Sequence, residues 1–147
     1  MASIRDVAAY ILQCKGGMTT MKLQKLAYYA QAWSLVWDEA PLFSNRIEAW
    51  ANGPVCPDLY QIHRGKYRVV KDDIGGEPDN LSESEKETID AVLKYYGDKP
   101  AQWLIELTHL ESPWKDARGD CTPGAACSNE ITHASMAEYY SSLSSDS

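Results

Sequence analysis

Cysteine and histidine are the residues of this chain best suited to metal binding. Cys121, Cys127 and His133 follow one another at intervals of six residues, and both cysteines lie in an expected loop. Structural zinc sites usually pair cysteines two to four residues apart, so this spacing does not indicate one. Cys56 and His63 would complete four ligands only if the fold brought them to the same place. We therefore predict no metal and keep a zinc site as an alternative.

Nucleophilic catalysis is a second chemistry open to these residue types. Cys56 stands beside a turn and would need His63 or His109 as its base. Nothing in the sequence indicates an activated thiolate, and an isolated cysteine commonly packs as a small hydrophobic residue. The chain also has no Gly-x-Gly-x-x-Gly or Walker phosphate-binding motif. We expect no enzyme activity and no cofactor, with a Cys/His enzyme as the alternative.

An aromatic and cationic face is the remaining chemical feature. Lys22, Lys25, Tyr28 and Tyr29 share one arc of an expected helix. Aromatic side chains dominate the energetics of protein–protein interfaces, so this arc is a candidate interface. The alternative is that the same arc packs inside the domain.

The helix that carries this face has almost no polar side. It is expected to begin at a Thr19 or Thr20 cap and to run to about Trp37. One arc carries Leu23, Leu26, Ala27, Ala30, Ser34 and Trp37. The second arc carries Lys22, Lys25, Tyr28, Tyr29, Ala32 and Val36. Only Gln24 and Gln31 separate the two arcs, so we place the helix at the centre of its domain, with the lysine heads reaching water.

Start and stop signals outline the other elements. Capping boxes at Ser3-x-x-Asp6 and Ser82-x-x-Glu85 begin two helices, which Gly16-Gly17 and Gly97 end. Further helices are expected over 58–63, from Pro100, from Ser112 to Gly119 and from about Thr132, and a short strand or an extended arm over 47–51. We predict a mainly α, compact single-domain bundle of about six to seven helices with at most one short β-hairpin. The domain spans 1–140, and 141–147 form a polar tail.

Charge and hydropathy limit the classes of partner. The 147 residues carry a formal net charge of −7 and no basic run, so direct binding of nucleic acid is disfavoured, and a basic protein partner is expected instead. No stretch approaches the roughly 20 apolar residues of a membrane span, and the N-terminus has no apolar core of a signal peptide. We predict a cytoplasmic protein whose cysteines stay reduced.

Three segments carry a resemblance to a known family. They are "MKLQKLAYYAQAW", "PLFSNRIEAWANGPVCPDLY" and "LSESEKETIDAVLKYYGDKPAQWLIELTHLESPWKDARG". In this order and at this spacing the chain resembles the Panacea domain, also called SocA-like, over about residues 3–140. The pairing of EAW…GPV…P…LY with SPW…ARG is its most specific part.

The resemblance implies an antitoxin that neutralises a cognate toxin by direct protein–protein binding. Family members occur in bacteria and their phages, and their targets include alarmone-synthetase-like enzymes that modify tRNA. A toxin–antitoxin hetero-oligomer is the implied assembly. One branch of the family instead delivers its toxin to a protease, and that adaptor role is the alternative. Many members carry an N-terminal DNA-binding extension, which this chain is not expected to have.

Partner contacts are sought among the residues that carry the resemblance. Leu23, Leu26 and Ala30 are assigned to the core, and Gly53 and Pro54 to a turn. The residues that remain as candidate contacts are Lys22, Lys25, Tyr28, Tyr29, Trp50 and Tyr60. The segment 68–80 is an alternative source of specificity, since a promiscuous family keeps its scaffold and varies its contact surface.

Overall fold

The computed structural model describes residues 2–144, and helices dominate that range. The α-helices are α1 Ile4–Lys15, α2 Thr20–Trp37, α3 Pro57–His63, α4 Lys71–Ile74, α5 Glu83–Tyr96, α6 Ala101–Leu110, α7 Ser112–Arg118 and α8 His133–Ser144. The other elements are the 3₁₀ helix η1 Pro78–Asn80 and the strands β1 Met18–Thr19, β2 Glu48–Trp50, β3 Gly53–Val55 and β4 Arg68–Val69. The predicted mainly α class is confirmed, with more helices than the six to seven expected.

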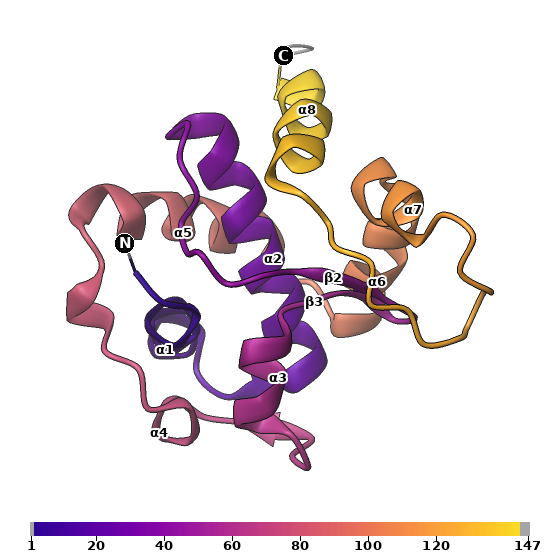
Figure 1. Cartoon of the computed structure of the whole chain (residues 1–147). Helices are drawn as coiled ribbons and strands as arrows, with labels where there is room; N and C mark the ends of the chain where they lie inside the picture. The colour runs from indigo at the N-terminus through magenta and orange to yellow at the C-terminus, as the bar shows by residue number, and fades with distance from the viewer. Residues whose placement is uncertain (1, 145–147) are drawn as a thin grey trace.

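Helix α2 lies in the middle of the molecule, and the other elements pack around it (Figure 1). It contacts α1, α5, α6, α8 and strand β3. The side chain of Thr19 accepts a hydrogen bond from the backbone N–H of Lys22 at 3.2 Å and so caps the helix as predicted. The central position agrees with the two-arc pattern of its sequence.

Local signals place the other helix ends. Ser3 with Asp6 and Ser82 with Glu85 form complete capping boxes at the starts of α1 and α5. Gly16 follows the last residue of α1 at a φ of 81°, a conformation that glycine adopts without steric cost. These boundaries are therefore confirmed.

Two short strand pairs complete the fold. Strands β2 and β3 form the predicted hairpin, in which Ala49 faces Pro54 and Trp50 faces Gly53. Strands β1 and β4 pair antiparallel although Met18 and its partner Val69 are 51 positions apart in the sequence. No local pattern indicates that second pair, because it depends on tertiary packing.

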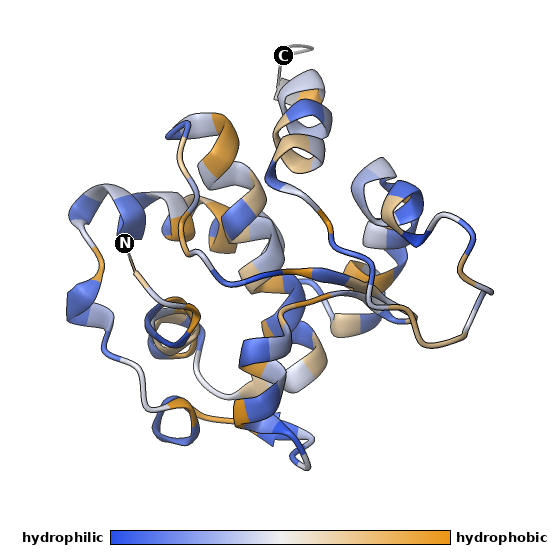
Figure 2. Ribbon diagram, viewed as in Figure 1, coloured by the Kyte–Doolittle hydropathy of each residue, from blue (hydrophilic) through white to orange (hydrophobic). Residues whose placement is uncertain are grey.

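The burial of polar side chains on α2 is the largest departure from expectation. Figure 2 shows blue, hydrophilic turns along this central helix. Lys25 is 0% exposed, and both Gln24 and Gln31 are buried. The expectation that the lysine heads reach water is therefore wrong for Lys25. Its ammonium nitrogen instead donates to the carbonyl oxygen of Pro54 at 3.2 Å, under the β2–β3 hairpin.

The cysteines also depart from expectation. Cys121 and Cys127 form a disulfide across a loop of six residues, with their Cα atoms 6.1 Å apart. The prediction that all four cysteines stay reduced is wrong for this pair, because the loop brings the two sulfur atoms together. Cys14 is exposed and Cys56 is buried, and both are free thiols.

The C-terminal segment is more helical than expected. Helix α8 includes residues 141–144 of the predicted polar tail, and residues 145–147 lie outside the described range. Within residues 2–144, no helix combines the length and the apolar character that crossing a membrane requires.

Candidate functional site

A groove of about 720 Å³ opens beside the β2–β3 hairpin. Its walls come from the hairpin, from α3, from the first turns of α2 and from residues 126–128 of the disulfide-closed loop. We call it the hairpin groove. It is built from segments far apart in the sequence, so only the fold assembles it.

Two of the predicted contact residues, Trp50 and Tyr60, meet in this groove. Side chains alternate along β2, so Ala49 points into the core while Glu48 and Trp50 are half-buried on the groove side. The rings of Trp50 and Tyr60 pack edge to face with centroids 5.1 Å apart. Tyr60 in turn meets the ring of His63 one turn later on α3, at 5.5 Å. The groove therefore has an aromatic wall.

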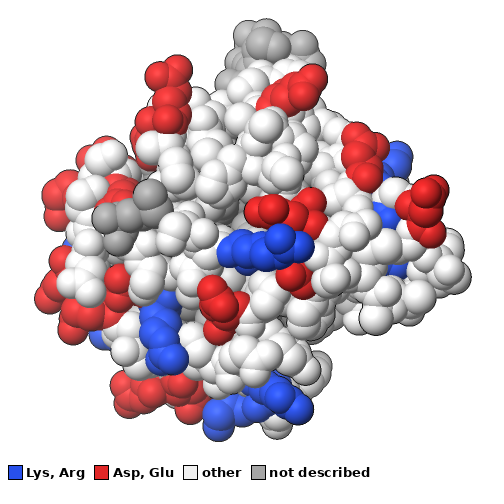
Figure 3. Space-filling model, viewed as in Figure 1, with Lys and Arg blue, Asp and Glu red and all other residues white. Residues whose placement is uncertain are grey.

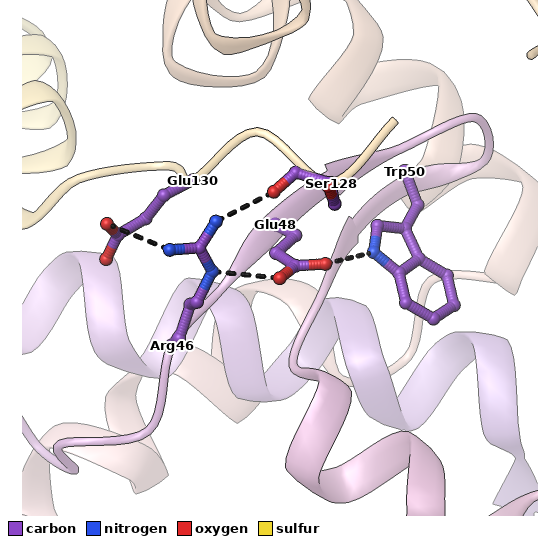
Figure 4. A network of polar contacts seen from close by, with 5 residues as sticks. All are labelled: Arg46, Glu48, Trp50, Ser128 and Glu130. Carbon is purple, nitrogen blue, oxygen red and sulfur yellow. Dashed lines mark hydrogen bonds and ion pairs between the residues drawn. The ribbon is translucent and has the colours of Figure 1, made fainter. Parts of the chain in front are cut away.

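A polar network holds the Trp50 indole in place (Figure 4). The Trp50 indole N–H donates to Glu48 Oε1 at 2.9 Å, and Arg46 Nε donates to Glu48 Oε2 at 2.8 Å. Arg46 also donates to the Ser128 carbonyl oxygen at 2.8 Å and pairs with Glu130 at 3.4 Å. The guanidinium thus neutralises Glu48 and ties the loop that contains Ser128 to the hairpin.

The floor of the groove is held by Gln24. Its side-chain oxygen accepts from the backbone N–H of Cys56 at 2.9 Å, which assigns the other end of the amide as the donor. That nitrogen donates to the Cys56 carbonyl oxygen at 3.3 Å and lies 3.0 Å from His63 Nε2. His63 Nε2 is then the acceptor, so the imidazole is neutral. Burial also lowers the pKa of His63, in agreement with that neutral form.

Lys25 lies beneath the hairpin without a carboxylate partner among residues 2–144. Burial lowers the pKa of its ammonium group to about 7, since the charged form loses its hydration. Gly53 covers it at a φ of +113°, and a Cβ there would lie 2.6 Å from Lys25 Cε. The hairpin turn therefore requires glycine for its conformation and for the space that Lys25 occupies.

The rim of the groove is basic. Arg64 is exposed and has no hydrogen-bond or ionic partner in the described part of the chain. The ammonium nitrogen of Lys66 lies 3.9 Å from Asp73, at the outer limit of an ion pair. Figure 3 shows blue lysine and arginine side chains at the lower edge of the molecule, below the position of α3 in Figure 1, with red acidic side chains beside them. The groove thus has a positive edge in a protein of net charge −7.

A buried cluster of tyrosines and one glutamate lies farther along α2. The hydroxyls of Tyr29 and Tyr140 both donate to Glu111 Oε1 at 2.7 Å. The Tyr28 hydroxyl lies 3.0 Å from the Tyr140 oxygen and donates to it, because the Tyr140 proton is engaged with Glu111. Burial raises the pKa of Glu111, and the two tyrosine donors oppose that rise.

A second groove, of about 480 Å³, opens next to this cluster between α2, α5 and α8. We call it the aromatic groove, and Trp33, Trp37, Tyr95, Tyr96 and Leu143 line it. Trp37 is 47% exposed, Tyr95 is 64% exposed and Leu143 is 43% exposed. Its lining is mostly apolar, and none of its lining residues is charged, whereas Glu48, Arg64 and Lys66 line the hairpin groove.

The six predicted contact residues differ in burial and do not form one surface. Lys25, Tyr28 and Tyr29 are at most 2% exposed, so their side chains are used inside the domain. Trp50 and Tyr60 come together in the hairpin groove. Lys22 is half-buried outside that groove, and burial and the neighbouring Lys15 lower its pKa.

Sequence reasoning missed Tyr95 and Arg64. Tyr95 falls outside the inward stripe of α5, a pattern that could have marked it as exposed. Arg64 carried no such signal.

The metal and nucleophile alternatives find little support in this geometry. No three His, Cys, Asp or Glu side chains within residues 2–144 are arranged to hold a metal ion. Cys121 and Cys127 are consumed by their disulfide. Burial raises the pKa of the Cys56 thiol to about 11, so this sulfur is protonated at neutral pH and is a poor nucleophile.

The comparisons with known proteins give one family. The model described as antitoxin SocA-like, Panacea domain, matches residues 23–115, more than half of the chain. The match includes α2, the β2–β3 hairpin, α3, α5 and α6. No curated protein and no solved structure matches the chain.

Proposed function

Because the chain belongs to the SocA-like antitoxin family defined by the Panacea domain, we propose that it neutralises a cognate toxin by binding that protein directly. The family match over residues 23–115 is the observation that carries this proposal. Neutralisation needs no catalytic group in this chain. The raised pKa of Cys56 supports a binding role over a catalytic one.

We assign the toxin-binding surface to the aromatic groove. Large aromatic side chains that stay exposed together on a folded domain mark interaction sites, because contact of apolar surface with water is unfavourable and a partner would remove it. Trp37 and Tyr95 belong to the residue types that contribute most to protein interfaces. Two helices and the end of a third frame this groove, which suits an apolar anchor of the partner.

The acidic surface supports a basic partner. The net charge of −7 favours a toxin with a positive surface, such as the tRNA-facing side of an alarmone-synthetase-like enzyme. Covering that side would keep the toxin from its substrate. Complex formation should then slow as salt is added, because screening removes long-range attraction.

The test uses the product of the reading frame next to this gene. Cells that express that protein should stop growing, and co-expression of the antitoxin should restore growth and yield a complex on co-purification. Trp37→Ala and Tyr95→Ala should weaken the complex by tenfold or more, in the range of interface hot spots. Trp103→Ala, at an exposed tryptophan outside both grooves, is the matched control.

Three outcomes are informative. A neighbouring protein that is neither toxic nor bound would contradict the antitoxin function. Loss of binding in Trp50→Ala and Tyr60→Ala, with Trp37→Ala unaffected, would keep the function and move the surface to the hairpin groove. A shorter half-life of the toxin in the presence of the antitoxin would indicate delivery to a protease and contradict steric blocking.

A further inference from the structure

The hairpin groove has the make-up of a small-molecule site, and the function proposed above does not use it. Pockets for small ligands measure roughly 300–1,000 Å³ and combine apolar walls with a few placed polar groups. This groove, of about 720 Å³, has Met21, Trp50 and Tyr60 on its walls and Gln24 and His63 on its floor. Its volume lies in that range, and its lining has the same combination of apolar walls and a few polar groups.

The aromatic wall suits a flat ring. Trp50 and Tyr60 pack edge to face and are both half-buried, so part of each ring faces the groove. The hydrogen bond from the Trp50 indole to Glu48 holds its ring in one orientation. A preorganised aromatic surface favours stacking, because little side-chain freedom is lost when a ring binds.

The charges of the groove favour an anion. Glu48 is held by Arg46 at 2.8 Å, and Arg46 also pairs with Glu130 at 3.4 Å, so this ion-paired cluster keeps one negative charge, to which the free cations of the rim are added. Arg64 is exposed without a partner in the described range, and Lys66 is held loosely by Asp73. Two cations are therefore available at one edge of an otherwise acidic protein, and such a positive site attracts and orients an anionic group.

A free amide lies elsewhere along the lining. Asn52 is exposed at the hairpin turn, and its side chain has no partner among residues 2–144. A side-chain amide donates and accepts hydrogen bonds at once, which matches the edge of a nucleobase. The groove thus offers aromatic rings for stacking, the Asn52 amide for hydrogen bonds to a base edge, and two cations at its rim for an anion.

We propose that the hairpin groove binds a free nucleotide, with the base against Trp50 and Tyr60 and the phosphates on Arg64 and Lys66. A mononucleotide fits better than a nucleic-acid chain, because the basic rim is confined and the rest of the surface is acidic. This site is independent of the toxin and is separate from the aromatic groove. It would make the antitoxin responsive to nucleotide levels.

The experiment measures binding to the full chain by calorimetry. ADP and GDP are the probes, and adenosine, guanosine and inorganic pyrophosphate separate the base from the phosphates. Arg64→Ala should weaken ADP and GDP binding by about tenfold or more and leave the nucleosides unaffected, because only the phosphates lose a charge-assisted contact. Tyr60→Leu should weaken nucleotides and nucleosides together.

Matched controls come from α5, which does not line the hairpin groove. Lys94→Ala removes an exposed cation of α5, and Tyr95→Leu removes an exposed ring of the aromatic groove. Both should bind the nucleotides as the unchanged protein does. The Arg64 side chain makes no hydrogen bond or ion pair within residues 2–144, so its variant should keep the circular dichroism spectrum of the parent.

Several results would overturn the proposal. One is the absence of ADP and GDP binding at millimolar concentration, and another is pyrophosphate binding as tight as that of the nucleotides. A third is an Arg64→Ala variant that binds ADP and GDP with unchanged affinity. Toxin binding that is lost in Arg64→Ala, in a protein that binds neither nucleotide, would assign the groove to the protein partner instead.

Discussion

Lys25 and Glu111 are two buried ionisable groups that contact different sides of the core around α2. Glu111 is 5% exposed, and one of its oxygens receives hydrogen bonds from two tyrosine hydroxyls. Lys25 is fully buried, and within the described residues 2–144 the only hydrogen bond of its ammonium group goes to the Pro54 carbonyl oxygen. The carboxyl group is thus supported by side chains, whereas the ammonium group depends on the backbone of the hairpin.

The difference shows how each groove keeps its shape. The tyrosines bound to Glu111 also pack against the lining of the aromatic groove, where Tyr140 meets Trp33 at 5.5 Å and Tyr29 stacks on Tyr96 at 4.1 Å. The hairpin groove rests on two side chains, Gln24 and Lys25, that hold backbone atoms of 54–56. We infer that the hairpin groove responds to changes of backbone and of pH, and the aromatic groove to loss of packing.

The largest effect is expected at the hairpin turn. Gly53→Ala places a Cβ 2.6 Å from Lys25 Cε at a φ of +113°. Backbone strain and overpacking each cost about 1–3 kcal/mol, so the free energy of unfolding should fall by about 4 kcal/mol in urea titrations. Gly124→Ala is the control, with a φ of +78° and no atom within 4 Å of its Cβ. Equal losses in the two variants would show that Lys25 does not constrain the turn.

Removal of the Glu111 acceptor is expected to have the next largest effect. Glu111→Ala leaves the Tyr29 and Tyr140 hydroxyls without their acceptor, and each unsatisfied buried group costs about 1–3 kcal/mol. Stability should fall by about 3 kcal/mol, and Glu111→Gln, which keeps an oxygen, should lose less. Glu87→Ala, at an exposed glutamate of α5, should change little. An unchanged free energy of unfolding in Glu111→Ala would mean that the two tyrosine hydroxyls find other hydrogen-bond partners.

The pH dependence should have opposite signs at the two sites. The pKa of Lys25 is about 7 in the folded protein and 10.5 as a free side chain, so the unfolded state binds the extra proton between these values. Stability should therefore rise with pH above 7, by up to about 1.4 kcal/mol per pH unit. The window for this measurement is pH 7–9, because the raised pKa of Cys56 acts in the opposite direction above 9.

Lys25→Met tests this assignment, since methionine fills similar space without a charge. Its unfolding free energy should be nearly independent of pH between 7 and 9, and at pH 7 it should equal or exceed that of the parent. An unchanged slope in this variant would assign the pH dependence to another group. Glu111 contributes with the other sign, because its raised pKa gives stability that is complete below pH 4.5 and is lost as the pH rises through the folded value.

The smallest effect is expected from the disulfide that borders the hairpin groove. A loop of six residues between Cys121 and Cys127 restricts the unfolded chain by about 2 kcal/mol in the chain-entropy model. Reduction should lower the melting temperature of the parent by a few degrees. The double variant Cys121→Ser, Cys127→Ser should melt at the reduced temperature with or without reductant. A variant that still responds to reductant would point to Cys14 or Cys56.

The sequence by itself determined most of the helices and where they begin or end, although it did not indicate α4. Ser3 with Asp6, Ser82 with Glu85, and Thr19 act on backbone groups within three residues, so their effect does not depend on the rest of the fold. The two arcs of α2 likewise predicted its central position, and Gly53 and Pro54 predicted the turn after the first strand of the hairpin. The motifs of these same segments indicated the family that the comparison then found.

Only the tertiary structure decided which polar side chains are buried and which aromatic ones stay exposed. Helical periodicity places Lys25 and Tyr29 on an arc, but it does not say whether Pro54 or water will meet the lysine. The β1–β4 pair, the Cys121–Cys127 bond and the two grooves each join residues whose separation in the sequence carries no local signal. The physical reason is that a cap or a turn is a short-range interaction, whereas burial depends on the whole chain.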